Sequence, residues 1–191
     1  IKVEDNGYKL GLNGVDNGKI WFTQVKVPRK NLLNKYGSIS DYGQYHSDIK
    51  NPNKRFFTML GTLVGGRICV ARAGLGGAKM ALTIAVKHAL KRRQFNDSIK
   101  IQEDLLMDYP THQLRLTPAI AKSYVYDITL QHVMKVYSDD SKTDKREIET
   151  QVAGLKSVIT WYANETIQEC REACGGKGYL IENRIADLKG D

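Results

Sequence analysis

The hydrophobic pattern is strongest between Phe56 and Phe95, a stretch without proline in which apolar side chains fall on nearly every face of a helix. This predicts one long buried helix, because a surface helix needs only one apolar stripe. Its many glycines and alanines allow close backbone approach, at about 1 kcal/mol of helix propensity per glycine. The roughly 20 apolar residues of a membrane span are not reached, because the run is broken by Arg67, Arg72, Lys79 and Lys87. We therefore expect no membrane span.

Residues 1–33 have the pattern of β-strands. Turn signals at positions 5–7 and 16–18 flank runs in which Trp21, Thr23, Val25 and Val27 alternate with their neighbours, the period of a half-buried strand. Pro28 is expected to end this strand. Residues 34–55 are rich in Gly, Ser, Asp, Asn and Tyr without periodicity, which predicts a long ordered loop and a domain boundary.

Two further helical regions follow the central stretch. A turn is expected at Asn96-Asp97-Ser98, and then a helix over 102–137 that Pro110 and Pro118 should end or kink. Residues 138–145 read as a solvated linker.

The last helical region should begin at an N-cap formed by Asp144 with Glu147. It should end at Gly175-Gly176 with a left-handed C-cap. The predicted fold is therefore mostly α, a bundle of long helices preceded by a short β remnant.

The charge balance is basic, with 29 Lys and Arg against 21 Asp and Glu and a net charge of +8. Such a surface suits an anionic partner, although it is equally consistent with a solvated surface. A basic helical module that binds nucleic acid, or a scaffold bundle, is an alternative function. Only 8% of the residues are aromatic and they do not alternate with the basic ones, so we expect no nucleic acid.

Cysteine and histidine usage excludes several kinds of site. Three cysteines are an odd number at no metal-ligand spacing, which argues for a reducing, intracellular environment. Cys170 and Cys174 are one helical turn apart, and we interpret them as core thiols. The four histidines do not cluster at metal spacing either, so we expect no metal site, and no Ser/His/Asp or Cys/His set is apparent.

Three stretches could carry chemistry. The basic run ending in Arg92, Gln94 and Phe95 would complement the dipole at a helix C-terminus, or it would bind a phosphate while Phe95 faces a ring. The glycine turn at 175–179 is either a helix cap or a side-chain-free surface for a cofactor. Arg67, inside an apolar helix, should be buried and paired, or should face an anionic ligand.

Taken in order, these stretches resemble the acyl-CoA oxidase family, relatives of the acyl-CoA dehydrogenases. The resemblance is carried by GVDNGKIWFTQVKVPRKNLL at 14–33, PNKRFFTMLGTLVGG at 52–66, RRQF at 92–95, THQ at 111–113 and QECREACGGKGY at 168–179. It covers nearly the whole chain. It implies that residues 1–33 are the end of a β middle domain and that residues 56–191 are a truncated C-terminal helical bundle. Residues 34–55 would be the loop that connects the two.

The resemblance also implies site residues for FAD, which the family binds at a homodimer interface. Arg92 would hold the pyrophosphate from across the dimer, with Gln94 and Phe95 beside it, and Gln113 would lie near the adenosine. The turn would contact FAD through its backbone, at Gly175, Gly176, Gly178 and Tyr179. Arg67 matches an arginine near the acyl-CoA and the flavin, and is the candidate substrate-binding residue.

Two positions depart from the family pattern. Asn96 replaces a common glycine, and Glu172 stands where many dehydrogenases have a cofactor-contacting glutamine. The base of the family is a glutamate expected beyond Asp191, so neither Glu172 nor Glu182 is assigned as the base and no residue of the chain is assigned as catalytic.

The activity that the resemblance implies is oxidation of fatty acyl-CoA to trans-2-enoyl-CoA, with a glutamate removing the α proton and hydride passing to FAD. An oxidase passes the electrons to O₂ and makes H₂O₂, whereas a dehydrogenase, the alternative, passes them to a flavoprotein. The protein would be peroxisomal in a eukaryote and cytoplasmic in a bacterium. The chain itself is expected to be an inactive fragment.

Overall fold

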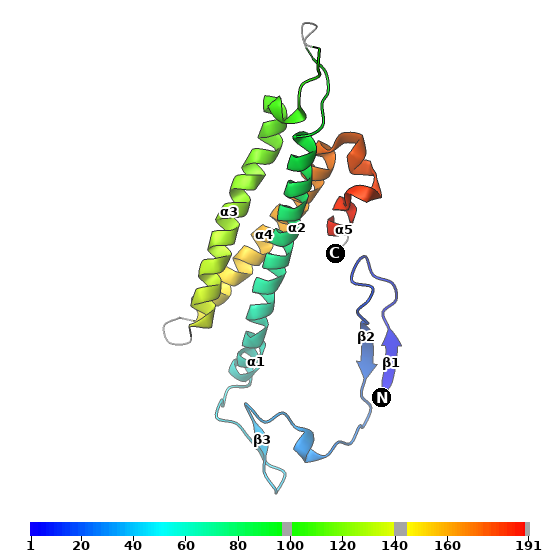
Figure 1. The fold of residues 1–191 in the computed structure, drawn as a ribbon. Helices are drawn as coiled ribbons and strands as arrows, with labels where there is room; N and C mark the ends of the chain where they lie inside the picture. The colour runs from blue at the N-terminus through cyan, green and yellow to red at the C-terminus, as the bar shows by residue number, and fades with distance from the viewer. Residues whose placement is uncertain (97–100, 140–144, 190–191) are drawn as a thin grey trace. The chain divides into compact units, whose positions relative to one another are not determined.

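The computed structural model describes residues 1–96, 101–139 and 145–189 (Figure 1). The chain divides into two compact units, Ile1–Leu63 and Val64–Asp191, which are described separately. The assignment of residues 1–33, 34–55 and 56–191 to domains of a longer protein stays a prediction.

The first unit contains two small hairpins. Strand β1 (Lys2–Asp5) pairs antiparallel with β2 (Gly18–Trp21), and β3 (Ser38–Ile39) pairs with β4 (Tyr45–His46). A 3-10 turn, η1, lies between them at Arg29–Asn31. The side chains of β1 and β2 are exposed on both faces.

The strand predicted to run as far as Val27 is shorter in the structure. Trp21 already pairs with Lys2, and residues 22–27 take part in no strand pairing and are irregular. Without that partner, the alternating pattern of Thr23, Val25 and Val27 does not form a strand. The predicted loop holds the β3–β4 hairpin.

Helix α1 (Pro52–Leu60) closes the first unit, and its start follows from local sequence. The Asn51 side chain accepts hydrogen bonds from the backbone N–H groups of Asn53 and Lys54, at 2.9 and 3.1 Å. Pro52 occupies the first helical position, where a missing N–H costs nothing. A 3-10 turn, η2 (Gly61–Leu63), follows α1.

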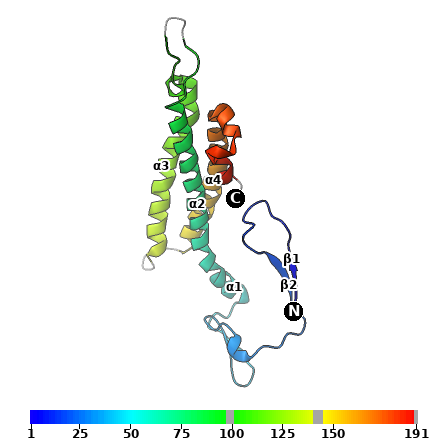
Figure 2. The same ribbon diagram turned by 45° about the vertical axis from the view of Figure 1, so that its right-hand side comes forward.

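The second unit is a bundle of three long helices. Figures 1 and 2 show α2 (Val64–Ala89), α3 (Pro110–Ser138) and α4 (Lys145–Ala173) lying lengthwise against one another. The short elements are η3 (Leu106–Asp108), η4 (Gly175–Tyr179), η5 (Ile181–Asn183) and α5 (Ile185–Lys189). The predicted mostly α bundle is confirmed.

The small residues of α2 allow α4 to pack closely. A Cβ added to Gly74 would lie 3.5 Å from the Cβ of Ala163, and one added to Gly77 would lie 3.6 Å from Cδ1 of Ile167. The core consists of three clusters along the bundle, and the buried residues of α2 are Val64, Ile68, Ala71, Leu75, Ala78, Ala81, Leu82, Ala85 and Ala89. Close packing offsets the helix-propensity cost of the glycines.

The prediction of one helix over 56–95 that is buried on nearly every face is wrong in two respects. The turn η2 separates α1 from α2, and α2 ends at Ala89 rather than Phe95. Only the side toward α3 and α4 is buried, because Val70 and Met80 of α2 are 47% and 57% exposed. In this chain, α2 therefore has more apolar surface than its bundle of three long helices buries.

By length and composition, one helical stretch of the described residues, Pro52–Ala89, could cross a membrane. The core helix of a soluble protein passes the same test, and one side of α2 is buried in the bundle. We therefore treat α2 as a core helix.

The second helical region begins later than predicted. Residues 102–109 contain the 3-10 turn η3, and α3 starts at Pro110, which takes its first position. Pro118 lies inside α3 without ending it. It is on the exposed side, where water can satisfy the carbonyl that its missing N–H leaves free.

The third predicted helix is confirmed as α4, and Gly175 has the expected left-handed backbone, with φ of 56°. The proposed cap at Asp144 and most of the linker lie outside the described residues. The same holds for Asp97 and Ser98 of the predicted turn.

Candidate functional site

Three of the predicted residues lie in a segment that is held tightly after α2. Arg93 and Leu105 form an antiparallel bridge. The backbone N–H of Gln94 donates to the carbonyl of Asp104 at 2.9 Å, and the N–H of Asp104 donates to the carbonyl of Phe95 at 2.8 Å. Tyr109 Oη also donates to the Gln94 carbonyl, at 2.6 Å. Residues 92–95 are therefore fixed against the approach to α3.

An open pocket of about 340 Å³ lies beside this segment, and it is lined by Gln94, Phe95, Leu106, Tyr109, Thr111, His112 and Arg115. The Phe95 side chain is 70% exposed, and its backbone has φ of 58°. A bulky residue in the left-handed region is strained, and such strain is found preferentially at functional sites. The pocket thus offers an exposed ring beside polar groups.

Arg92 precedes this pocket at the end of α2. Its side chain is exposed, and no carboxylate pairs with it in the part of the chain that the structure describes. Burial lowers the pKa of His88, and the nearby charges of Arg92 and Lys177 lower it further. The end of α2 and the glycine turn therefore lie close to one another and are electropositive.

His112 was not selected from the sequence, yet it is an unusual residue of the pocket. Its Nε2 atom is buried and has no hydrogen-bond partner among the described residues. Burial lowers its pKa first, and the charges of Arg115 and His88 add to this, whereas Glu169 opposes it. His112 is therefore held neutral at physiological pH.

Gln113 follows His112 but does not line the same pocket. Its Nε2 donates to the Met107 carbonyl at 2.8 Å. With Leu114 and Pro118 it lines a second, mostly apolar hollow of about 440 Å³. The structure thus brings Gln94 and Phe95 together and leaves Gln113 on a neighbouring surface.

The three glycines of the turn at 175–179 differ in what the structure requires at each position. Gly175 needs its left-handed backbone to end α4. Gly178 packs on the carbonyl of Arg171, because an added Cβ would lie 1.9 Å from that oxygen. A Cβ at Gly176 would meet nothing within 4 Å, so packing of the described residues does not explain this glycine.

Tyr179 ends the turn with a side chain that is 87% exposed. In the described chain, neither Tyr179 nor Gly176 is covered by a neighbouring element. Only Gly178 of the turn is buried, so Gly176 and Tyr179 belong to its accessible part.

Arg67 is exposed on α2, so the expectation of a buried guanidinium inside an apolar helix is wrong. The buried stripe passes through Val64 and Ile68, and Arg67 points away from it. Exposure keeps open its role as a contact for an anionic ligand.

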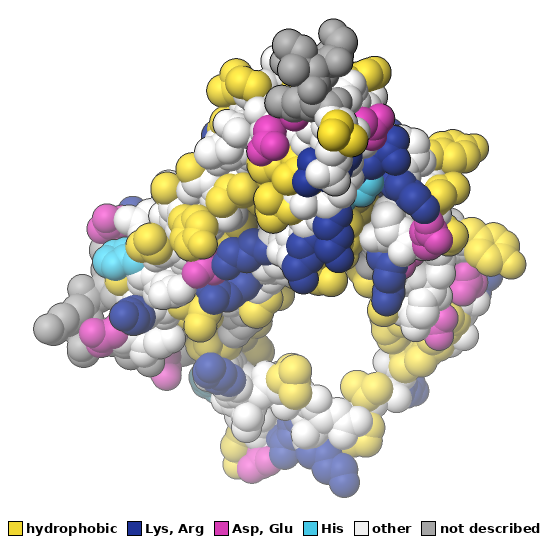
Figure 3. Space-filling model, turned by 45° about the horizontal axis from the view of Figure 1, so that its top comes forward, with side chains coloured by type: hydrophobic (Ala, Val, Ile, Leu, Met, Phe, Trp, Pro, Cys, Tyr) yellow, Lys and Arg dark blue, Asp and Glu magenta, His cyan; other side chains and the backbone are white. Residues whose placement is uncertain are grey.

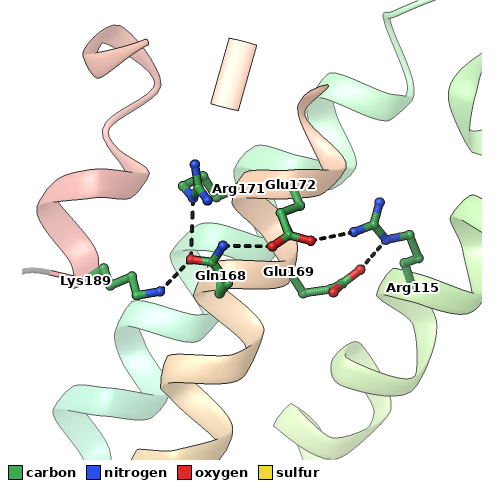
Figure 4. Close-up of polar contacts among 6 residues, drawn as sticks. All are labelled: Arg115, Gln168, Glu169, Arg171, Glu172 and Lys189. Atoms are coloured by element: carbon green, nitrogen blue, oxygen red, sulfur yellow. Dashed lines mark hydrogen bonds and ion pairs between the residues drawn. The ribbon is translucent and has the colours of Figure 1, made fainter. Parts of the chain in front are cut away.

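Arg115 is a second residue that sequence reasoning missed. Figure 4 shows its guanidinium between two carboxylates of α4: Nε donates to Glu169 Oε1, and Nη2 donates to Glu172 Oε2 at 3.2 Å. Hydrogen bonding to Glu169 is the main cause that raises the pKa of Arg115. Glu172 also accepts a hydrogen bond from Gln168 Nε2 at 2.8 Å, the main cause that lowers the pKa of Glu172.

A sequence signal for this network did exist. Glu169 and Glu172 lie in the last turns of α4, where the helix dipole disfavours negative charge, so a cation from another element should compensate them.

The two C-terminal cysteines lie in the core, as the sequence analysis expected. Cys170 and Cys174 are buried free thiols, and burial raises the pKa of Cys170 to about 12. Both therefore stay protonated in the core, as predicted. Among the described residues, no group of three or more His, Cys, Asp or Glu side chains could hold a metal ion.

On the face drawn in Figure 3, dark blue groups of Lys and Arg side chains lie among exposed apolar and acidic ones. On this face, positive charge is therefore mixed with apolar surface.

Comparison with known proteins gives consistent results. The family model for the acyl-CoA oxidase C-alpha1 domain matches residues 60–191. The chain is 41% identical over 191 residues to a relative named acyl-coenzyme A oxidase 3, peroxisomal, from Arabidopsis thaliana. The matched region is 100% of this chain and 28% of that protein.

Solved structures of acyl-CoA oxidases are also similar to nearly the whole chain. The structure of acyl-CoA oxidase 1 from Yarrowia lipolytica has a TM-score of 0.82 at 31% identity, covering 99% of this chain and 29% of that one. The structure of acyl-CoA oxidase 2 from Caenorhabditis elegans, solved with FAD, ascaroside-CoA and ATP, has a TM-score of 0.75 at 29% identity. The match covers 97% of this chain and 28% of that one.

Proposed function

The chain belongs to the acyl-CoA oxidase family, and from this premise we propose that it is part of a flavoenzyme that oxidises fatty acyl-CoA to trans-2-enoyl-CoA. The electrons pass to O₂ and give H₂O₂. The chain spans 28% of the length of its Arabidopsis relative, so this activity belongs to the full-length protein. The matching relatives are oxidases, which supports O₂ over a flavoprotein as the electron acceptor.

The observation that carries the proposal is the exposed Arg92 at the end of α2, which pairs with no carboxylate among the described residues. A guanidinium stays charged at every physiological pH, and its planar fork fits two phosphate oxygens. Two other cations nearby already have partners: Arg115 pairs with Glu169 and Glu172, and Lys177 pairs with Glu182 at 2.9 Å. Within the described chain, Arg92 is therefore available for an external anion.

The residues around Arg92 fit FAD. The exposed Phe95 ring offers a flat apolar surface to a ring system, and Gln94 lies beside it in the pocket. Gly176 leaves space for a ligand to approach the backbone. Gln113, Gly175, Gly178 and Tyr179 remain candidate contacts at the same end. When bound, FAD supplies the acceptor for the hydride that leaves the substrate.

Glu172 and Glu182 are unsuited to act as the base. A general base works best when its pKa lies near the operating pH, which for a carboxyl means a raised value. The pKa of Glu182 is lowered by its hydrogen bond from Lys177, and that of Glu172 is lowered mainly by Gln168. This supports a base elsewhere in the full-length protein.

Three further assignments belong to the same proposal. The exposed Arg67 contacts the acyl-CoA, because its charge has no carboxylate partner among the described residues and faces outward. The enzyme is a homodimer, in which Arg92 reaches the cofactor of the partner. It works in the peroxisome, since its Arabidopsis relative is named peroxisomal.

Replacement of Arg92 tests the proposed flavin site. Arg92→Ala in the full-length protein should weaken flavin retention, because hydrogen bonds to charged groups contribute about 1.5–3 kcal/mol. The measurement is the ratio of FAD to protein after gel filtration. Lys91→Ala is the matched control, since it removes the same charge one residue earlier. A normal flavin content in Arg92→Ala would refute the assignment.

A further inference from the structure

The network around Arg115 is the least expected feature of this end of the bundle. Beyond the two carboxylates, Gln168 Oε1 accepts hydrogen bonds from Lys189 of α5 and from Arg171 Nε at 3.4 Å (Figure 4). The six side chains thus connect α3, the last turns of α4 and α5. They do so next to the pocket, because Arg115 is also one of its lining residues.

The carboxylates of this network lie where the dipole of their own helix disfavours negative charge. Glu169 and Glu172 are one helical turn apart near the C-terminus of α4, where the dipole and their mutual repulsion both disfavour them. Arg115 comes from another helix, in the second turn of α3. The two carboxylates are therefore unfavourable in α4 alone and are compensated only when α3 and α4 are held together.

The position of Glu172 indicates what this arrangement fixes. It lies three residues before Gly175, at the base of the turn that holds Gly176 and Tyr179. On the other side of the ion pair, α3 carries Thr111 and His112 of the pocket. A link from Arg115 to Glu172 therefore joins the pocket to the glycine turn.

We propose that Arg115 is a positioning residue that, through Glu172, holds the Gly175–Tyr179 turn against the pocket side of α3. This rests on the proposed function, because both surfaces are assigned there as contacts for the flavin. Arg115 acts on the turn and not by its own contact with the ligand. Its guanidinium hydrogens on Nε and Nη2 are already directed at Glu169 and Glu172.

A double-mutant cycle in the full-length protein tests the proposal, with Arg115→Gln, Glu172→Ala and both together. Lys122→Gln is the control, because it removes an exposed cation from the same helix. The first readout is amide hydrogen exchange of residues 174–180 in flavin-free protein. The second is the dissociation constant for added FAD.

We expect each single variant to speed exchange in the turn and to weaken FAD binding about fivefold, equal to about 1 kcal/mol at 1.4 kcal/mol per tenfold. The double variant should be no worse than either single one, because both remove the same link. Lys122→Gln should match the wild type in both measurements.

Several outcomes overturn the proposal. Wild-type exchange in Arg115→Gln would show that Arg115 does not position the turn. Additive losses of FAD affinity would show that Arg115 contacts the ligand independently of Glu172. If the exchange effects occur and the wild type binds no FAD, the positioning role stands as a property of the turn and the proposed flavin function fails. The two proposals are thus separable.

Discussion

The three glycines of the 175–179 turn should respond differently to alanine, because each is glycine for a different reason. In Gly178→Ala the new Cβ would lie 1.9 Å from the Arg171 carbonyl oxygen and 2.9 Å from its carbon. These are backbone atoms near the end of α4, so no side-chain rotation relieves the clash. Overpacking of this kind costs about 1–3 kcal/mol. Part of this destabilisation is offset, because alanine lowers the conformational entropy of the unfolded chain, which stabilises the fold by about 0.4–1 kcal/mol.

Gly175→Ala should cost less. Its backbone has φ of 56°, and a residue with a Cβ pays about 1–2 kcal/mol in that region. Gly176→Ala meets nothing within 4 Å, and its φ lies outside the left-handed range. The free energy of unfolding of the Gly176→Ala variant should therefore equal that of the wild type or exceed it by about 0.5 kcal/mol.

Urea unfolding followed by far-ultraviolet circular dichroism measures this series. The free energy of unfolding should fall most for Gly178→Ala, less for Gly175→Ala and not at all for Gly176→Ala. In the full-length protein, Gly176→Ala should nevertheless lose flavin, because the added methyl group occupies the open approach to the backbone. A large destabilisation by Gly176→Ala, or none by Gly178→Ala, would refute the assignment of structural and ligand-directed glycines.

Three other outcomes follow from the structure. The lowered pKa values of His88 and His112 mean that the unfolded chain binds more protons below their ordinary value of 6.5, so stability should fall as pH drops through that range. Replacing both histidines by glutamine should flatten this slope, and an unchanged slope would show that these two side chains do not cause it. The 191-residue chain should self-associate through its exposed apolar faces, whereas a clean 21.5 kDa monomer in sedimentation equilibrium would contradict this. The same chain with added FAD should not oxidise acyl-CoA, and turnover above a free-flavin control would show that the expected base is not required.

The helices could be predicted from sequence because their signals are local. Pro52 after Asn51 marks the start of α1, and Gly175 marks the end of α4. Burial could not be predicted in the same way, since it depends on which sides receive a neighbour. The apolar residues Val70 and Met80 are exposed for this reason, and so is Arg67.

The candidate site was predicted only where motifs are contiguous. Arg92, Gln94 and Phe95 stand together in the chain, whereas Arg115 and Glu172 meet only after α3 packs on α4. The two carboxylates near the end of α4 indicate that a cation is needed, but which residue supplies it depends on how α3 packs on α4. The buried His112 Nε2, without a partner among the described residues, is another such feature, since its surroundings come from the fold.

Oxidation of acyl-CoA by the full-length protein under air, with FAD present, tests the central claim most directly. We predict that enoyl-CoA and H₂O₂ form in equal amounts and that both stop when O₂ is removed. Enoyl-CoA formation that needs an added electron acceptor under air, and yields no H₂O₂, would contradict the oxidase function. The absence of any acyl-CoA oxidation by flavin-loaded protein would contradict the proposed activity altogether.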